Sequence, residues 1–280
     1  MTQNSCRTVF KRIISNGLNE WLPRHCALCE IRLTGPASPN WLAPPNDPAQ
    51  TDPQALGLCA GCRHSLPGLN APRCLRCGLV DRACPAPSGA ANLTPCADAL
   101  AAAELDAIVV AGDYARPLDR WITAMKYGGN PALAQWLGAL LADSARRAPI
   151  ARSIEWLIAV PPARERLVER GFDHTAALAR PVARALNRPL QRGQLSRDRH
   201  TPRQAGLKRA ARQASLSGAF TAAPQVAARV IGLVDDVMTS GATLQAAARA
   251  LRAAGAAQII ALVVARTPTE TRAAQQAPIA

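Results

Sequence analysis

Residues 230–244 constrain the fold of this chain more than any other stretch. A β-branched apolar run ends in two adjacent carboxylates, Asp235 and Asp236. A small, hydroxyl-bearing turn follows, and then an Ala/Leu/Arg segment at 244–254 with high helical propensity. This order predicts a buried strand, a loop and a helix. Open α/β sheets bind ligands at the carboxyl ends of their strands, which is where these polar groups fall.

The turn after the two acids suits a phosphate group. Its backbone N–H groups lead into a helix N-terminus, whose unpaired donors and dipole favour an anion. The Gly-x-x-x-x-Gly-Lys-Ser/Thr pattern of a nucleoside triphosphate P-loop is absent. The candidate binding residues of this strand end and turn are Val237, Met238, Thr239, Ser240, Gly241, Ala242 and Thr243.

The carboxylate pair points to a second kind of group beside the phosphate. Asp235 and Asp236 repel a phosphate but suit hydroxyl groups, such as the 2′- and 3′-OH of a ribose. A phosphate-binding turn beside carboxylates that bind two hydroxyl groups predicts a site for a ribose 5-phosphate. The alternative is structural: one of the two acids merely caps the next helix through an Asx-type turn.

Arginines follow the next candidate strand, residues 154–160, which runs into two prolines. Guanidinium groups bind phosphate oxygens in a bidentate fashion, so the cluster of Arg164, Arg166 and Arg170, ending at Gly171, suits a pyrophosphate. The alternative is a solvated helical turn in which glutamates pair the arginines. Lys126, just before a Gly-Gly break, is a further candidate for an anion contact.

The cysteines indicate metal binding. Of the nine, six form three Cys-x-x-Cys pairs. The segment before them lacks the continuous apolar core of a secretory signal, and no run is long enough to span a bilayer. A cytoplasmic protein is therefore expected, in which paired cysteines are metal ligands rather than disulfides. Reduced structural cysteines are the alternative.

Four thiolates bind Zn²⁺ tetrahedrally, and two separated pairs supply them two by two. The first two pairs predict one site, and the third pair predicts a second site if two later cysteines complete it. A zinc ribbon, single or double, is therefore expected over residues 25–100, with a Pro-rich loop at 35–53. The candidate ligands are Cys26, Cys29, Cys59, Cys62, Cys74, Cys77, Cys84 and Cys96.

The remaining chain divides by composition. Residues 1–24 have the spacing of an amphipathic helix, for docking on the protein body or a membrane surface. An α/β domain is expected over 104–270, followed by a polar tail at 271–280. Segment 190–229 holds eight basic residues against one acid, and predicts a mobile basic flap that closes over a charged substrate or follows a nucleic-acid backbone. The net charge of +14 also indicates polyanionic partners.

Taken together, these motifs resemble the ComF family, competence-associated phosphoribosyltransferase-like proteins with an N-terminal zinc ribbon. The resemblance covers roughly residues 24–267 and implies the type I phosphoribosyltransferase fold, a parallel sheet flanked by helices. By this resemblance the Asp-Asp stretch is a motif for 5-phosphoribosyl 1-pyrophosphate (PRPP), residues 164–170 form the pyrophosphate loop and 195–216 the flexible loop. Asp173-His174 and Ala214 depart from the family pattern.

The resemblance implies displacement of pyrophosphate from PRPP with Mg²⁺, by a protein linked to DNA uptake and competence or to nucleotide metabolism. The acid pair and the three arginines would be catalytic. No stretch identifies an acceptor, and the oligomeric state is left open. The alternative is a non-catalytic protein that binds single-stranded DNA and keeps the fold as a sensor or scaffold.

Overall fold

The computed structural model describes part of the chain: residues 31–32, 59, 61–62, 65–69, 71–80, 104–128, 131–197 and 218–267, without the side chains of 131–132. The predictions for the segments 1–24, 35–53 and 271–280 lie outside these residues. So do those for Cys26, Cys29, Cys84 and Cys96, and the middle of the predicted flap.

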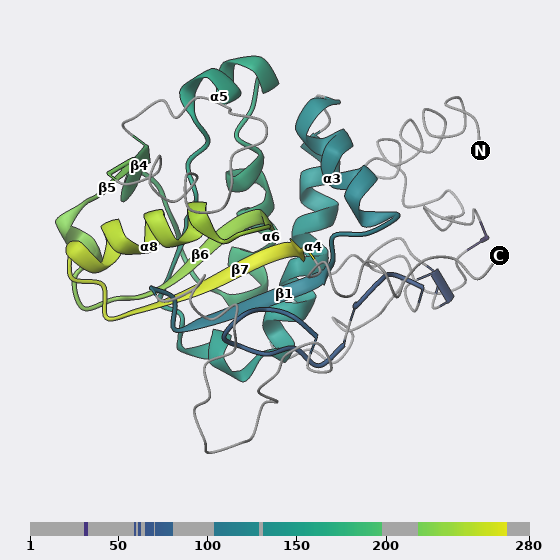
Figure 1. Cartoon of the computed structure of the whole chain (residues 1–280), viewed down its shortest axis with the longest axis horizontal. Helices are drawn as coiled ribbons and strands as arrows, with labels where there is room; N and C mark the ends of the chain where they lie inside the picture. Colours follow the sequence, from purple (N-terminus) through teal and green to yellow (C-terminus); the bar gives the residue numbers. More distant parts are fainter. Residues whose placement is uncertain are drawn as a thin grey trace.

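A five-stranded, fully parallel sheet forms the centre of the fold (Figure 1). Its strand order is β1-β7-β6-β2-β3, so the strand bearing the acid pair is central. The strands are β1 (Ala107–Asp113), β2 (Trp156–Ala159), β3 (Leu190–Gln191), β6 (Val230–Met238) and β7 (Gln258–Arg266). The parallel α/β architecture expected from the sequence is confirmed.

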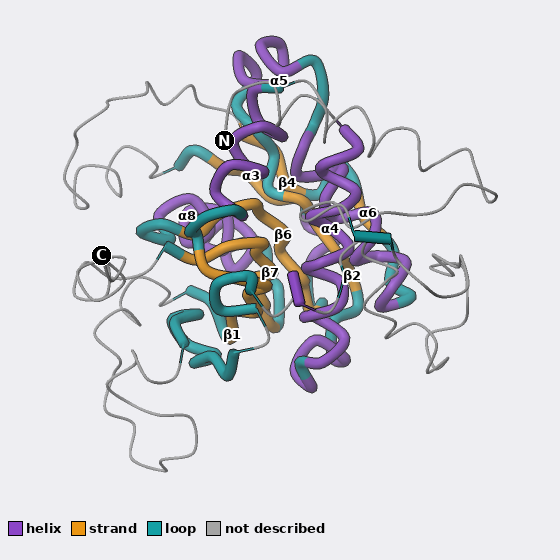
Figure 2. Tube along the Cα trace, turned by 90° about the vertical axis from the view of Figure 1, so that its right-hand side faces the viewer, coloured by secondary structure: helices purple, strands orange, loops and turns teal. Residues whose placement is uncertain are grey.

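Helices cover both faces of the sheet (Figures 1 and 2). Three of them pack on one face, and α8 packs on the other. A short helix, α5, projects beyond the carboxyl ends of the strands and buries none of its residues. The α-helices are α3 (Leu118–Tyr127), α4 (Pro131–Arg147), α5 (Arg164–Arg170), α6 (His174–Leu186) and α8 (Ala242–Ala253), with 3-10 turns η5 (Pro149–Ser153) and η6 (Pro224–Val226).

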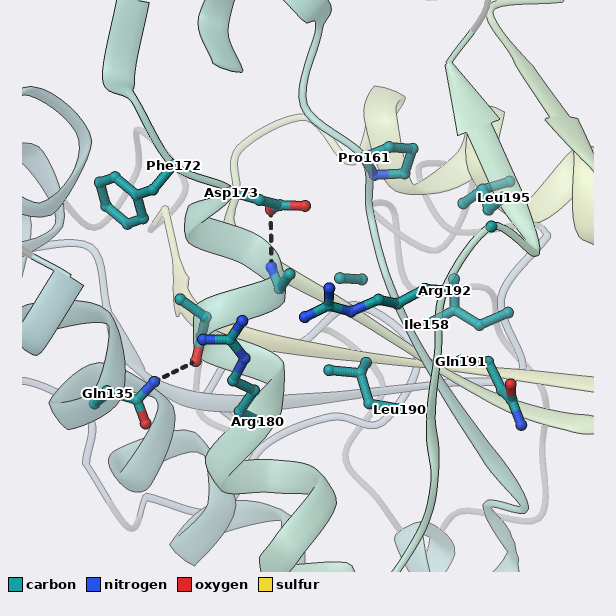
Figure 3. Close-up of a pocket in the computed structure, with 14 residues that line it drawn as sticks. Gln135, Ile158, Pro161, Phe172, Asp173, Arg180, Leu190, Gln191, Arg192 and Leu195 are labelled. Atoms are coloured by element: carbon teal, nitrogen blue, oxygen red, sulfur yellow. Dashed lines mark hydrogen bonds between the residues drawn. The ribbon is translucent and has the colours of Figure 1, made fainter. Parts of the chain in front are cut away.

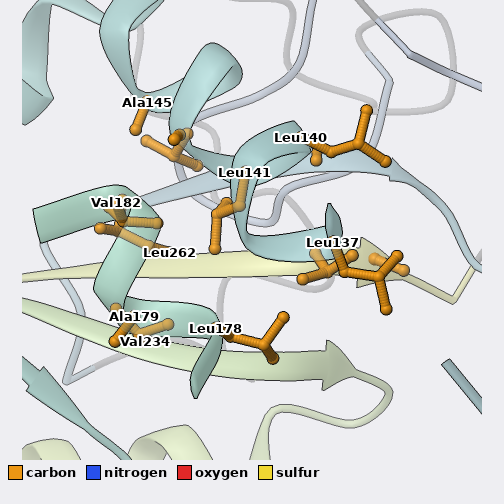
Figure 4. Packing of buried hydrophobic residues seen from close by; sticks show 14 of the residues in the cluster. Leu137, Leu140, Leu141, Ala145, Leu178, Ala179, Val182, Val234 and Leu262 are labelled. Carbon is orange, nitrogen blue, oxygen red and sulfur yellow. The ribbon is translucent and has the colours of Figure 1, made fainter. Parts of the chain in front are cut away.

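The two faces of the sheet have separate hydrophobic cores because successive side chains of a strand point in opposite directions. In β7, Ile260 and Leu262 join the core under α4 and α6, whereas Ile259 and Ala261 join the core under α8. Figure 4 shows Leu262 of β7 and Val234 of β6 packed beneath helices α4 and α6. A strand buried on both faces explains the uninterrupted apolar sequence.

Part of the Cys-rich segment covers the outer edge of β1, which would otherwise expose unpaired backbone groups. The N–H of Ile108 donates to the carbonyl oxygen of Leu75 at 2.7 Å, and that of Asp113 donates to Pro67 at 2.8 Å. Arg73 forms an ion pair of 2.8 Å with the buried carboxylate of Asp113. The part of this segment around Pro67, Arg73 and Leu75 is therefore packed against the sheet.

The prediction of a mobile flap over residues 190–229 is wrong at both ends. The segment begins with β3, and strands β4 (Leu195–Arg197) and β5 (Phe220–Ala222) then form an antiparallel pair. Leu195 and Phe220 are buried in the core under α8. These strands are only two or three residues long, and each contributes one or two apolar residues, which is too short a pattern to recognise in a basic sequence. Residues 198–217 lie outside the described part.

Candidate functional site

The two acids lie near the carboxyl end of β6 and on opposite sides of it. Asp236 is 5% exposed, whereas Asp235 is half-buried. Strand alternation directs Asp236 toward the face that carries α3 and α6, where its partners lie. Asp235 faces the other side. At the carboxyl end of β6, one carboxylate therefore lies on each face of the sheet.

Asp236 is held by two basic side chains from different helices. Lys126 Nζ, at the end of α3, lies 3.0 Å from Oδ2, and His174 Nε2, at the start of α6, lies 2.9 Å from the same oxygen. Burial alone would raise the pKa of Asp236, but these two partners outweigh burial and lower that pKa to about 2. Asp236 is therefore an anion at neutral pH. Lys126 is occupied by this carboxylate, and its predicted contact with a substrate anion stays a prediction.

Arg170 extends the same network. Its Nη1 lies 3.0 Å from both Nδ1 and Nε2 of His174, and its guanidinium lies 5.6 Å from the ring centroid of Tyr127. The Asp236 carboxylate accepts from Nε2, so only Nδ1 is left to accept from Arg170, which can only donate. Arg170 Nε is buried and has no hydrogen-bond partner among the described residues. The helix α5 thus ends with a buried donor for which the described residues supply no acceptor.

Asp235 has the opposite electrostatic character. Burial and the neighbouring charge of Asp236 raise the pKa of Asp235 to about 7, against smaller opposing effects of its hydrogen bond and of nearby cations. Its Oδ1 accepts a hydrogen bond of 2.8 Å from the backbone N–H of Asp236. Adjacent acids with pKa values this far apart are typical of functional sites.

The predicted phosphate turn has the geometry of a helix N-terminus. Gly241 adopts a left-handed conformation, with φ 76°, and is the N-cap of α8. The helix begins at Ala242, two residues earlier than the sequence indicated, so its first-turn N–H groups belong to the turn itself. Thr239 is exposed, and Ser240 and Thr243 are half-buried. The turn therefore offers both hydroxyl and backbone amide donors.

Two neighbours of the turn contribute differently. The side chain of Met238 is buried in the core under α8, so only its backbone remains near the turn, and Val237 is half-buried. Arg266, which sequence reasoning missed, supports the turn from below. Its Nη1 donates to the carbonyl oxygens of Met238 at 3.2 Å and Thr239 at 2.5 Å. The only sequence signal was a charged residue at the end of an apolar strand.

The predicted pyrophosphate arginines are not equivalent. Arg166 pairs with Glu169 within α5, as the structural alternative expected, and Arg164 is exposed. Of the three, Arg170 alone reaches the acid cluster. Gly171, with φ 74°, ends the helix and turns the chain toward α6. His174 and Tyr127 complete the cluster and were not predicted as site residues, because their role depends on contacts between separate helices.

The described cysteines form two turns typical of metal knuckles. The N–H of Cys62 donates to Cys59 Sγ at 3.3 Å. At the other turn, Gly78 N–H donates to the Cys74 carbonyl oxygen at 2.8 Å, and Gly78 has φ 72°. Within the described part of the chain no three potential ligands come together as a metal site. Each predicted zinc site has half of its cysteines outside that part, so both sites stay predictions.

No helix in the described ranges is long and apolar enough to cross a membrane.

Comparison with known proteins agrees with the site. The model of the phosphoribosyl transferase domain matches residues 175–278, which include the acid pair and the phosphate turn. Together with the parallel sheet flanked by helices, this match identifies a type I phosphoribosyltransferase fold.

Curated relatives extend the likeness to more of the chain. The chain is 31% identical over 163 residues to DNA utilization protein YhgH of Escherichia coli O157:H7, which covers 57% of this chain and 72% of the relative. It is 29% identical over 210 residues to competence protein F of Haemophilus influenzae, covering 72% of this chain and 87% of that protein. With these relatives and the domain match, the chain belongs to the ComF family of phosphoribosyltransferase-like proteins.

Proposed function

We propose that the chain binds PRPP at the carboxyl end of β6 and displaces its pyrophosphate. One observation carries this proposal: the adjacent acids Asp235 and Asp236 lie near the end of β6, shortly before the left-handed Gly241 that opens α8. The first-turn amides of α8 suit the 5-phosphate, and the carboxylates suit the ribose hydroxyls. A site that only capped a helix would have no need of two acids with divergent pKa values.

The surrounding residues suit departure of pyrophosphate from C1 of the ribose. In the transition state the sugar gains oxocarbenium character and the leaving group gains negative charge. Arg170, whose Nε has no hydrogen-bond partner among the described residues, would stabilise that charge, and Arg164 and Arg166 lie on the same short helix. The carboxylates at the end of β6 stabilise the positive sugar. The carboxylates of Asp235 and Asp236 would help to hold Mg²⁺, which would neutralise negative charge on the leaving group.

The cysteine knuckles suit a structural Zn²⁺. Each Cys-x-x-Cys turn offers two thiolates, and tetrahedral coordination needs two turns. The described knuckle at Cys74 and Cys77 lies against β1 and Arg266, so the ion would hold this segment on the sheet. We therefore assign Zn²⁺ a stabilising role and no part in the reaction.

Titration calorimetry with PRPP and Mg²⁺ tests the binding step. Asp235→Asn is expected to weaken binding at least tenfold, whereas Arg249→Gln on the far part of α8 serves as a matched surface control. Equal affinities for the wild type and the Asp235→Asn protein would contradict the proposal. Turnover is tested separately, by pyrophosphate release from PRPP across a panel of nucleobases and single-stranded DNA, because the acceptor is not defined by the site.

A second function, binding of single-stranded DNA, is favoured by the net charge of +14 and by the names of the relatives, a competence protein and a DNA utilization protein. Phosphate contacts make such binding strongly dependent on salt. DNA affinity that falls steeply with salt and is unaffected by Asp235→Asn would support this function independently of PRPP. Salt-independent or absent DNA binding would exclude it.

A further inference from the structure

A cavity of about 520 Å³ lies beside the sheet edge formed by β2 and β3. Neither Asp235 nor Asp236 lines it, so it is separate from the acid cluster. It lies between the start of α6, the end of β3 and the root of β4 (Figure 3). Its volume is within the range of small-molecule sites, about 300–1,000 Å³.

The floor of the cavity is apolar. Ile158 of β2, Ala177 of α6 and Leu190 of β3 line it, and Leu195 of β4 closes one side. Phe172 and Pro161, at the two ends of the segment that contains α5, also line the cavity. A lining of aliphatic and aromatic groups suits the ring of a base.

Two exposed arginines converge over this floor. Arg180 rises from α6, and Arg192 extends from the end of β3 toward the same place (Figure 3). Neither makes a hydrogen bond or an ion pair with another described residue. Two guanidinium groups that point toward one place, with no acid paired to them among the described residues, favour an anion, and their donors suit a phosphate.

The remaining polar lining does not cancel this charge. Asp173 is the only acid in the lining, and its Oδ1 already accepts from Ala176 N at 2.9 Å and from Thr175 Oγ1 at 2.8 Å as the cap of α6. Two arginines against one acid leave the lining with a net positive charge. The side-chain amides of Gln135 and Gln191 add neutral donors and acceptors at the rim.

From these features we propose that the cavity binds a nucleoside 5′-monophosphate, with its phosphate on Arg180 and Arg192 and its base over the apolar floor. The amides at the rim match the mixed donors and acceptors of a base edge.

The test uses calorimetric titration of the full chain with deoxyadenosine monophosphate, in the absence of PRPP. Arg180→Gln and Arg192→Gln are each expected to weaken binding about tenfold, and Ala176→Leu, which fills the cavity without changing charge, is expected to abolish it. Both arginines are exposed, so thermal unfolding of their variants should match the wild type. Deoxyadenosine and inorganic phosphate, titrated separately, should each bind more weakly than the nucleotide.

The control variants separate this site from the proposed PRPP site. Asp235→Asn and Arg249→Gln should leave binding of the nucleotide unchanged. Absence of binding at millimolar nucleotide, affinity unaffected by both arginine substitutions, or loss of binding in Asp235→Asn would overturn the proposal. If a 5′-phosphorylated single-stranded hexamer competes with the nucleotide, the ligand of the cavity is the 5′ end of a DNA strand. If the hexamer does not compete, the ligand is the free nucleotide.

Discussion

Arg266 donates from Nε to the carbonyl oxygen of Cys77 at 3.0 Å, and its Nη1 donates to the phosphate turn. One buried guanidinium thus joins the Cys-rich segment to the loop proposed to hold the 5-phosphate. The side chain is 4% exposed, so water cannot replace these hydrogen bonds. The position of the turn therefore depends on a segment more than 150 residues earlier in the chain.

Replacing Arg266 with methionine should weaken both stability and phosphate binding. The substitution leaves buried carbonyl oxygens without donors, each at a cost of about 1–3 kcal/mol, so the free energy of unfolding should fall by at least ~2 kcal/mol. Urea unfolding measures the first effect and PRPP titration the second. Arg249→Met, a half-buried arginine on α8, is the control. A variant with unchanged PRPP affinity would show that the turn is held without Arg266.

Replacing Lys126 with methionine should destabilise the protein in a pH-dependent manner. Asp236, whose folded pKa is lowered, contributes stability above its unfolded pKa of about 4, and this contribution is lost as pH falls toward about 2. Without Lys126 the lowering shrinks, so the variant should lose about 1–2 kcal/mol at pH 7 and less at pH 3. Chemical unfolding at both pH values measures this. Arg120→Met, exposed on the same helix, should change neither, and an equal loss at both pH values would disprove the charge mechanism.

PRPP binding should strengthen as pH rises from 6 to 8. Asp235, whose pKa is raised to about 7, is half-protonated at neutral pH, and only its carboxylate form suits the developing positive charge of the sugar and its Mg²⁺ complex. Binding should therefore release a proton, which calorimetry in buffers of different ionisation enthalpy detects. PRPP itself titrates in this range, so the comparison is with Asp235→Asn, in which the protein's share of the proton release should disappear.

The same raised pKa predicts an effect on folding of opposite sign to that of Asp236. The folded state holds a proton that the unfolded state has lost, so stability falls as pH rises from about 4 to about 7 and is constant above. Asp235→Asn should remove this slope and be more stable than the wild type at pH 8. Thermal unfolding of both proteins from pH 4 to pH 8 measures it. Parallel curves for the two proteins would contradict a raised pKa.

Replacing Gly241 with alanine should reduce PRPP affinity. The loss of affinity should be larger than the loss of folding stability alone would cause. A left-handed alanine costs about 1–2 kcal/mol, because its Cβ meets the following carbonyl oxygen. Relief of this strain would rotate the amides at the start of α8 away from the phosphate. Gly218→Ala is the matched control, with φ 68° and open space around the glycine. Equal PRPP affinities for the two variants would argue against a role for the turn.

Removal of zinc should destabilise the protein. Metal analysis of the purified chain is expected to find bound Zn²⁺, one ion or two according to whether Cys84 and Cys96 complete a second site. Cys74→Ser should lower the zinc content and the melting temperature together, since metal binding contributes directly to folding. Cys6→Ser, outside the predicted ligand set, is the control. If the purified, folded protein contains no metal, the cysteines are reduced structural thiols instead of zinc ligands.

Strong local patterns allowed much of the sheet to be predicted. The apolar runs of β1, β6 and β7 are buried on both faces, so their sequences carry the pattern without interruption. Helix α6 was missed although it packs against β2 and β6, because Pro181 interrupts its pattern. His174, at the start of α6, was therefore not predicted as a partner of Asp236, because that contact depends on how α6 packs.

The sequence by itself determined the chemistry of the acid pair and its turn, because strand, carboxylates, glycine and helix are consecutive and their geometry is local. Tertiary structure alone decided which charges act on them. Lys126, Arg170, His174 and Arg266 come from four separate elements, and only the packing of those elements around the central β6 brings them to one place. Charge interactions depend on distance in space and on burial, neither of which separation along the chain records.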